Sequence, residues 1–246
     1  MQTTPRWSTG WSVVRLLIAV LIVAAVIAQL VRSIGNAVEG HHDVATVVVN
    51  FLSFFTIDSN LVSMVVLVIV GLRGLLGRRD VTSASFALNL VRACAATYMI
   101  ITGVVYNTLL RGIELPQGVT VPWSNEVLHV VAPLFMLIEL LFGSSPPRLP
   151  WRAVWGILAF PLVWVVYTMV RGPLVTNPTT GAAWWYPYPF MDPHVVNGYV
   201  GVVPYIVGIA VGLVAFGSGV VYVGRRRTAV STVHDGAVIS PADQAL

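Results

Sequence analysis

A threonine and a histidine are the residues of this chain whose side chains could perform nucleophilic chemistry together. A threonine hydroxyl is a weak nucleophile until a base removes its proton, and a neutral imidazole can take that proton and return it to a leaving alkoxide. We single out Thr56 and His129. Counted at about 1.5 Å per residue from the outer ends of their predicted helices, they lie at similar depths. The chain has no Gly-x-Ser-x-Gly elbow that would favour a serine nucleophile.

Thr56 belongs to a stripe of polar residues. Ser53, Thr56, Asn60 and Ser63 recur at helical spacing, which places them on one narrow face of a helix. Asn60 lies one turn from Thr56 and is the nearest candidate donor for the oxyanion of an ester intermediate. The same stripe could instead hold helices together by hydrogen bonds, and that structural interpretation stays open.

His129 has two polar neighbours on its own helical face. Asn125 lies four residues before it and Glu126 three residues before it, and either could hold the imidazole in one tautomer. A histidine in an apolar helix also commonly serves as a packing or hydrogen-bonding group. The spacing therefore predicts an oriented imidazole without deciding between catalysis and packing.

The composition indicates what kind of protein positions these residues. Of 246 residues, 57% are hydrophobic and only 10% are charged, whereas soluble domains carry about a quarter charged residues. Each apolar block is about as long as the ~20 residues that a membrane-spanning helix needs. We predict an all-α transmembrane bundle of six spans, with these blocks: Ser12–Val31, Val48–Val70, Ser83–Leu109, Glu126–Phe142, Trp151–Val170 and Tyr199–Val223.

Arginine placement predicts the orientation of the bundle, because short arginine-rich loops stay on the cytoplasmic side. Most arginines fall on one side of the predicted spans, and this side also holds both termini. We therefore predict a six-helix transmembrane domain over residues 1–227, and a disordered cytoplasmic tail over residues 228–246. All basic residues are arginine, which favours a GC-rich genome and so a bacterial cytoplasmic membrane. A soluble basic face of the kind that binds nucleic acid is absent from the sequence.

Asp58 and Arg92 are charged residues that fall well inside the second and third predicted spans. Asp58 points away from the Thr56 face, and Arg92 lies in the next predicted helix at what we take to be a similar depth. A lone charge in the membrane would cost several kcal/mol, so we expect these two side chains to form a structural ion pair.

The segment before the last predicted helix is rich in aromatic residues. It contains Trp184-Trp185-Tyr186-Pro187-Tyr188-Pro189-Phe190. Aromatic rings with polar edges settle at the membrane–water interface, so anchoring is the simplest role. We also expect Trp185 and Tyr186 to contact substrate as part of a partial lid. His41, His42 and Asp43 could assemble an outer zinc site with Asp192 or His194, but adjacent histidines without His-Glu-x-x-His spacing are a weak signal. We therefore predict no metal site and no cofactor.

Three stretches resemble the androgen-induced-gene family of multispan membrane hydrolases and its bacterial six-span relatives. Phe54-Phe55-Thr56-Ile57-Asp58 resembles the aromatic threonine segment of that family. Asn125-x-x-x-His129, followed by Pro133 and Leu137-Ile138-Glu139, is similar to its histidine helix. Trp185-Tyr186-Pro187 with Pro189-Phe190 resembles the element before its last helix. The order and span count agree over most of residues 12–223.

The resemblance implies hydrolysis of fatty-acid esters of hydroxy fatty acids within the membrane. It implies a threonine nucleophile and a histidine partner, which correspond to Thr56 and His129 in this chain. The expected substrate-binding residues are Asn60, Asn125, Trp185 and Tyr186, and the expected partners are membrane lipids and a fatty-acyl ester.

A non-catalytic protein that binds or moves a lipid or small solute is the alternative function. Both functions require a polar cavity between the second and fourth predicted helices. Transporters more often contain internal repeats, and the two halves of this chain show no obvious similarity. The sequence therefore favours the hydrolase over a transporter.

Overall fold

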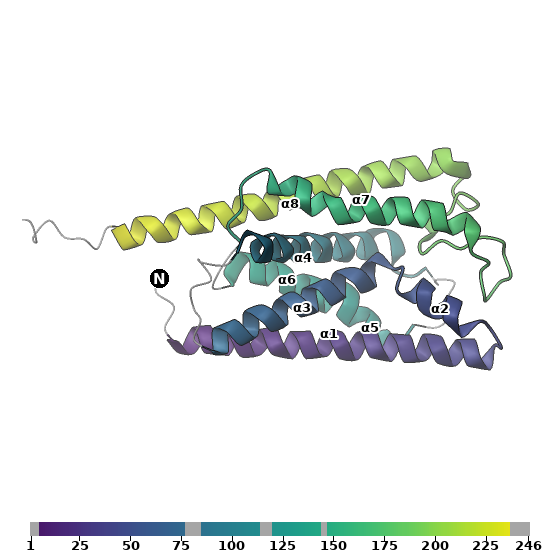
Figure 1. The fold of residues 1–246 in the computed structure, drawn as a ribbon, viewed down its shortest axis with the longest axis horizontal. Helices are drawn as coiled ribbons and strands as arrows, with labels where there is room; N and C mark the ends of the chain where they lie inside the picture. The colour runs from purple at the N-terminus through teal and green to yellow at the C-terminus, as the bar shows by residue number, and fades with distance from the viewer. Residues whose placement is uncertain (1–4, 77–84, 114–119, 144–146, 237–246) are drawn as a thin grey trace, which may run out of the picture.

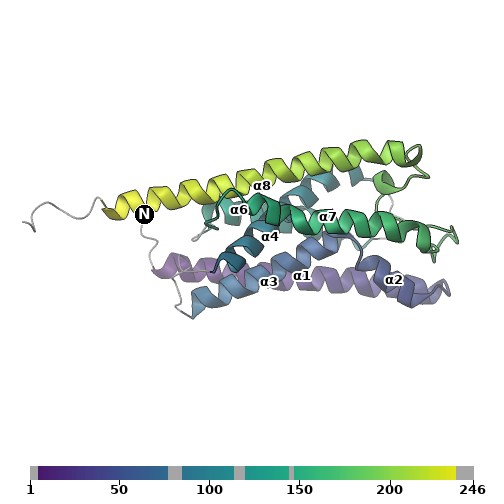
Figure 2. The ribbon, with the colours of Figure 1, turned by 45° about the horizontal axis from the view of Figure 1, so that its top comes forward.

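The computed structural model describes residues 5–76, 85–113, 120–143 and 147–236, with side chains placed over residues 9–227 of these. Every regular element in this part of the chain is a helix, and six helical segments are long and apolar enough to cross a membrane. Helices satisfy backbone N–H and C=O groups internally, as hydrocarbon requires. The predicted all-α bundle of six spans is confirmed, and its helices run side by side along one axis (Figure 1, Figure 2).

Three of the six predicted blocks do not form single α-helices. The elements are α1 (Pro5–Glu39), α2 (Val44–Phe51), α3 (Phe55–Leu75), α4 (Phe86–Val105), η2 (Tyr106–Leu110), α5 (Pro122–Glu126), η3 (Val127–Val131), α6 (Ala132–Phe142), α7 (Ala153–Arg171) and α8 (Gly198–Gly236). The predicted second block is divided between α2 and α3. The third ends in the π-helical segment η2, and the fourth combines α5, the π-helical η3 and α6. The predicted start of the third block, Ser83, lies outside the described residues.

The helix α4 lies in the middle of the bundle, where α3, α6, α7 and α8 all contact it. Its buried face carries small side chains, including Ala93, Ala95 and Ala96. Small residues let membrane helices approach closely, which van der Waals packing requires. Near the carboxyl end of α4, a Cβ built on Gly103 would lie 2.9 Å from Cβ of Pro133, so α4 and α6 nearly touch there.

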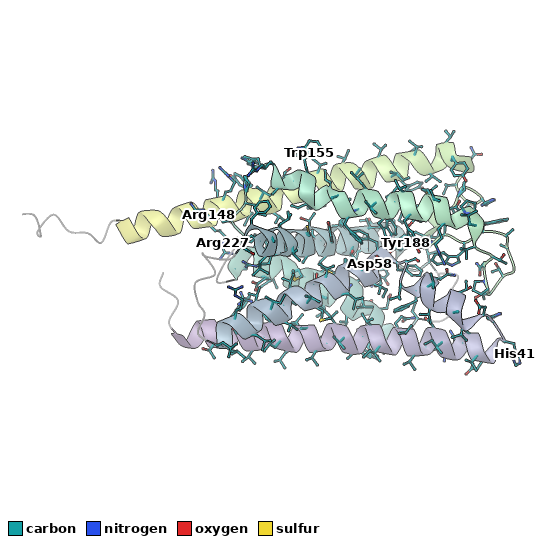
Figure 3. The ribbon with its side chains drawn as sticks, in the orientation of Figure 1. His41, Asp58, Arg148, Trp155, Tyr188 and Arg227 are labelled. Atoms are coloured by element: carbon teal, nitrogen blue, oxygen red, sulfur yellow. The ribbon has the colours of Figure 1, made fainter. Side chains whose placement is uncertain are left out.

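Charged contacts gather at the end of the bundle that holds both chain termini (Figure 1). Arg15 of α1 forms a two-pronged ion pair with Glu139 of α6, with N–O distances of 2.7 and 3.1 Å. The Arg227 guanidinium donates to the carbonyl oxygens of Leu140 and Gly143, which end α6. Figure 3 shows Arg148 and Arg227 at this end, which we call the arginine end, and His41 at the opposite end.

The expected ion pair between Asp58 and Arg92 is wrong. Because α3 begins at Phe55, Asp58 lies in its first turn, where a carboxylate is favoured by the helix dipole. Arg92 lies near the start of the antiparallel α4, at the arginine end. It donates to Asn89 Oδ1 at 3.4 Å and lines a cavity of about 20 Å³ together with Glu139. This cavity is also lined by Val66 and Val70 of α3, which lie about two turns or more beyond Asp58, so the two charges are well separated along the bundle.

The last helix extends past the predicted boundary between the transmembrane domain and the tail. Helix α8 continues to Gly236, beyond the predicted boundary at residue 227. No glycine or proline stands between Gly224 and Gly236, so nothing in that stretch interrupts a helix before the glycine at its end. Residues 237–246 lie outside the described residues.

The connection between α7 and α8 folds over the end of the bundle opposite to the arginine end. It contains two short 3₁₀ helices, η4 (Gly172–Leu174) and η5 (Pro189–Met191). Its aromatic side chains are mostly buried, with Trp185, Tyr188 and Phe190 each less than a tenth exposed. The loop is thus part of the packed structure and can place side chains among the helices.

Candidate functional site

A break in the second span places Thr56 at the start of a helix. The backbone leaves helical geometry over Leu52–Phe54, where the Ser53 hydroxyl donates to the Val49 carbonyl at 2.7 Å. Trp164 of α7 donates its indole N–H to the Ser53 carbonyl at 3.0 Å, so tertiary contacts hold the break. Thr56 is the second residue of α3, where backbone N–H groups lack partners in the helix. Ser53 is consequently not part of the polar stripe on α3.

The turn that carries His129 is irregular because of a proline four residues later. Pro133 has no N–H to donate to the preceding turn, which is π-helical. Two asparagine side chains supply the missing donors: Nδ2 of Asn60 lies 3.1 Å from the Leu128 carbonyl oxygen, and Nδ2 of Asn107 lies 3.3 Å from that of His129. The position of the imidazole is therefore set by contacts from three different spans.

The structure brings Thr56 and His129 together. Oγ1 of Thr56 lies 3.2 Å from Nε2 of His129. The other ring nitrogen, Nδ1, lies 2.9 Å from the Asn125 carbonyl oxygen, which can only accept a hydrogen bond. Nδ1 therefore carries the proton, and Nε2 presents a lone pair to the Thr56 hydroxyl.

The face of the imidazole ring is also in contact with a neighbouring aromatic side chain. Tyr106 stacks on His129 with ring centroids 4.0 Å apart, and the Asn125 side chain donates to the Tyr106 hydroxyl. Asn125 thus orients His129 twice, by its backbone carbonyl and through Tyr106. Glu126, the other predicted partner of the imidazole, forms an exposed ion pair with Arg111 at 3.2 Å instead.

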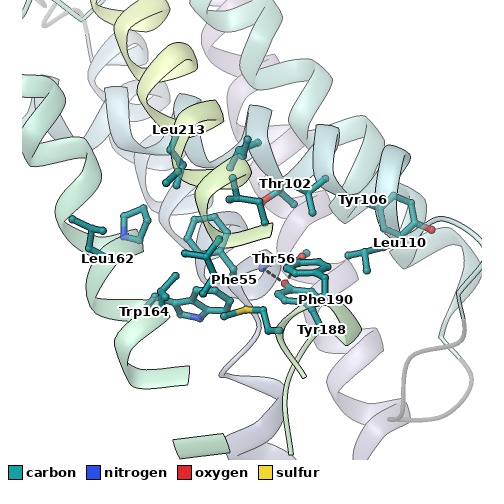
Figure 4. Close-up of a pocket in the computed structure, with 18 of the residues that line it drawn as sticks. Phe55, Thr56, Thr102, Tyr106, Leu110, Leu162, Trp164, Tyr188, Phe190 and Leu213 are labelled. Atoms are coloured by element: carbon teal, nitrogen blue, oxygen red, sulfur yellow. Dashed lines mark hydrogen bonds between the residues drawn. The ribbon is translucent and has the colours of Figure 1, made fainter. Parts of the chain in front are cut away.

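Tyr188 completes the hydrogen-bonded cluster and was missed by the sequence reasoning. Its hydroxyl oxygen lies 3.3 Å from the Thr56 backbone nitrogen and 3.2 Å from Thr56 Oγ1 (Figure 4). If Thr56 donates to His129, the phenol accepts from the backbone N–H and donates to Oγ1. Burial raises the pKa of Tyr188 to about 12, which keeps it a neutral donor. The only signal in the sequence was the aromatic run itself, which does not say which ring turns inward.

Trp185 and Tyr186 precede Tyr188 in the loop and pack against the neighbouring helix ends. Trp185 packs edge-on against Phe54, with ring centroids 5.8 Å apart, and lies under the Arg171 guanidinium at 5.3 Å. The Tyr186 ring covers Gly172, where any Cβ would lie only 2.2 Å from a ring carbon. Within the described residues, neither ring lines a cavity next to Thr56. Their contacts favour a structural role over the substrate contact that we expected.

Asn60 occupies a similar supporting position. Both hydrogens of its amide are used, because Nδ2 also donates to the Thr56 carbonyl oxygen at 2.8 Å. The side chain is fully buried and lines neither cavity next to Thr56 within the described structure. The contacts of Asn60 therefore support a bracing role, and Tyr188 is the donor that reaches Thr56 Oγ1.

Thr56 forms part of the wall between two cavities. The larger, of about 110 Å³, has mostly apolar walls from α4, α7 and α8. The smaller, of about 60 Å³, includes the polar side chains of Gln29, Asn125 and His129. Thr56 and Tyr188 line both cavities. Thr56 therefore lies between an almost wholly apolar space and a smaller space that also contains His129.

The histidines near the ends of the connecting segments lie apart from this site. His194 pairs with Asp192 at 2.9 Å and stacks on Trp184, with ring centroids 3.6 Å apart. Among the described residues, no group of three or more His, Cys, Asp or Glu side chains has a geometry that could hold a metal ion.

Comparison with known proteins does not identify a family for this chain. No family model, no curated protein and no solved structure matches the chain. The resemblance of the motifs around Thr56, His129 and Trp185 to the androgen-induced-gene family is therefore a hypothesis, and the contacts of the site carry the functional argument.

Proposed function

We propose that this protein is an intramembrane hydrolase of lipid esters, with Thr56 as nucleophile and His129 as base. The observation that carries the proposal is the 3.2 Å contact between Thr56 Oγ1 and His129 Nε2, with Nδ1 engaged by a backbone carbonyl. Fatty-acid esters of hydroxy fatty acids, or similar lipids, are the substrate class that the motif resemblance favours. The absence of lysine from the sequence supports the cytoplasmic membrane of a bacterium as the location.

The reaction proceeds in two acyl transfers. As Thr56 Oγ1 attacks the ester carbonyl carbon, its proton passes to Nε2 of His129. The tetrahedral intermediate then expels the alcohol, which takes that proton as the C–O bond breaks. Water attacks the resulting acyl-threonine ester and gives a proton to His129. That proton returns to Thr56 as the carboxylic acid leaves, so the enzyme is regenerated and one water is consumed.

Tyr188 and the start of α3 stabilise the negative charge that develops in each intermediate. The phenol is a neutral donor within reach of Thr56 Oγ1, and small rotations can turn it toward the carbonyl oxygen. The amino terminus of α3 adds a partial positive charge of about half an elementary charge. Both contributions act in an apolar setting, where electrostatic stabilisation is stronger than in water.

Lipid binding without catalysis is the second candidate. The larger cavity favours it, because its mostly apolar walls would suit an acyl chain whether or not Thr56 reacts. The two candidates differ in what they predict for Thr56. A lipid-binding protein would still bind lipid without the Thr56 hydroxyl, whereas a hydrolase would lose its activity.

Labelling of the protein in native membranes by a fluorophosphonate probe tests the hydrolase. We expect the parent to be labelled and to cleave p-nitrophenyl esters. Thr56→Ala and His129→Ala should each lose labelling and turnover while melting like the parent, and Thr56→Ser should retain part of the activity. Thr97→Ala and His42→Ala are matched controls, since Thr97 is a buried membrane threonine away from both cavities and His42 lies outside the bundle.

Tyr188→Phe tests the proposed oxyanion donor separately. Loss of one such donor typically lowers kcat by about 10²–10³-fold, with the fold intact. Turnover by the Thr56→Ala variant at the rate of the parent, or complete absence of ester hydrolysis by the parent, would exclude the catalytic function and leave lipid binding.

A further inference from the structure

The two cavities that meet at Thr56 differ in the residues that line them. We propose that the larger cavity takes the fatty acyl chain of the substrate from the lipid between α7 and α8, and that the smaller one receives the alcohol and admits water. This inference rests on the proposed hydrolase function, which it extends to the orientation of the substrate and the residues that sense chain length. Thr56 and Tyr188 stand at the junction of the two cavities.

The larger cavity reaches the lipid-facing surface of the bundle. Leu162 of α7 lines it and is also 58% exposed on the outside. Ile209 and Ala210 of α8 line it from the other side and are partly exposed. Figure 4 shows Leu162 and Leu213 among the side chains that line this space, together with Thr56. A chain can therefore pass from the membrane to Thr56 without crossing a polar surface.

The smaller cavity is also mostly apolar, but it has more polar side chains in its wall. Its walls include Gln29 of α1 and Thr120, and Gln29 accepts a hydrogen bond from the Val121 backbone at 3.0 Å. His129 lines this cavity and not the larger one. These polar groups, His129 above all, offer water and an alcohol hydrogen-bond partners.

The chemistry of acyl transfer fixes which part of the ester enters which cavity. The leaving alkoxide must receive its proton from His129, so it has to lie on the side of Thr56 where the imidazole is. The attacking water must give its proton to the same nitrogen and enters from that side as well. The acyl chain then occupies the remaining direction, which is the larger, apolar cavity.

The proposal predicts selectivity by acyl-chain length through residues of α8. Ala210→Trp would fill the cavity near its membrane rim. The ratio of kcat/KM for p-nitrophenyl palmitate to that for p-nitrophenyl acetate should fall about tenfold or more, since pockets discriminate 10–200-fold per methylene-sized change. Val207→Trp is the matched control, because Val207 lies on α8, is 54% exposed and does not line the cavity. Leu213→Ala should shift the ratio in favour of longer chains.

A crosslinking experiment keeps the inference testable without catalysis. Palmitic acid carrying a terminal diazirine is photolysed with the parent protein in membranes, and the modified peptides are mapped by mass spectrometry. We expect modification of α7 and α8 near Leu162 and Ala210, reduced at least several-fold in Ala210→Trp but not in Val207→Trp. Modification confined to other helices, or unchanged in Ala210→Trp, would overturn the proposal.

The two experiments separate this inference from the proposed function. If the parent hydrolyses no ester but crosslinks at α7 and α8 in an Ala210-dependent way, the hydrolase fails and the lipid-side cavity stands. If the parent hydrolyses esters and Thr56→Ala does not, while Ala210→Trp leaves both the chain-length ratio and the crosslinks unchanged, the hydrolase stands and the assignment of the cavities is wrong.

Discussion

The two ends of the bundle are held together by different means. At the arginine end, regular helices are joined by charged contacts, of which the buried pair between Arg15 and Glu139 is the clearest. At the opposite end, a helix break, two π-helical segments and a folded loop are joined by neutral hydrogen bonds around Thr56 and His129.

The difference indicates a division of roles. A buried ion pair fixes the packing of helices, because neither partner can leave the other without a large desolvation cost. A base that must gain and lose a proton is better placed among neutral partners, which allow the imidazole to change its charge during a reaction. The irregular backbone supplies those partners, because each interrupted turn frees a carbonyl or N–H group for a contact with another span.

The two ends of the bundle should lie on opposite sides of the membrane, and labelling of introduced cysteines tests this with an all-or-none result. In a Cys94→Ala background, we expect Thr179→Cys to react with an impermeant maleimide in intact cells and Arg148→Cys to react only after lysis, because arginine-rich loops stay in the cytoplasm. Both residues are exposed on the protein. Labelling of Arg148→Cys in intact cells would invert the orientation and place the candidate site toward the cytoplasm.

The largest stability effect should come from the arginine end. Glu139→Gln should lower the free energy of unfolding by about 3–5 kcal/mol, because it leaves the Arg15 charge buried without its carboxylate. Asp58→Asn is the matched change at the other end, where the carboxylate forms no ion pair within the described part of the chain. Thermal melting in detergent should show a small shift for Asp58→Asn, and equal shifts for the two variants would contradict the comparison.

A smaller stability effect is expected within the polar stripe of α3. Asn60→Leu removes the donor to the Leu128 carbonyl, and should cost about 1 kcal/mol while reducing probe labelling of Thr56. Ser63→Ala is the control, because the Ser63 hydroxyl is buried on the same helix and forms no hydrogen bond among the described residues. Melting and labelling measured together distinguish bracing of His129 from general packing. If Asn60→Leu matches Ser63→Ala in both, Asn60 does not position the site.

The smallest effect concerns the cap of α2. Hydrogen bonds from the Thr46 side chain and backbone lower the pKa of Asp43 from its ordinary 3.8. A lowered folded-state pKa stabilises α2 at neutral pH, and this contribution is lost as the pH falls through the folded value. Hydrogen exchange at the Thr46 amide should accelerate relative to unstructured peptide on going from about pH 7 to about pH 3. Asp43→Asn should remove this pH dependence.

The sequence alone determined the architecture, and it singled out Thr56 and His129, whose side chains the structure brings into contact. Long apolar blocks can only be helices in hydrocarbon, so composition and length were enough for six spans. Thr56 and His129 were found because membrane helices contain few polar side chains, and depth along a helix follows from counting residues. Both inferences depend on local properties of the chain, which do not require knowledge of distant contacts.

The tertiary structure decided everything that depends on where helices are interrupted. The helix is interrupted before Phe55, where Trp164 of another span donates a hydrogen bond to the Ser53 carbonyl. Asp58 therefore lies in the first turn of α3, away from Arg92. Tyr188 reaches Thr56 across 132 residues of sequence. Contacts of this kind arise from the packing of whole spans and the fold of a loop, and no spacing rule within a single helix encodes them.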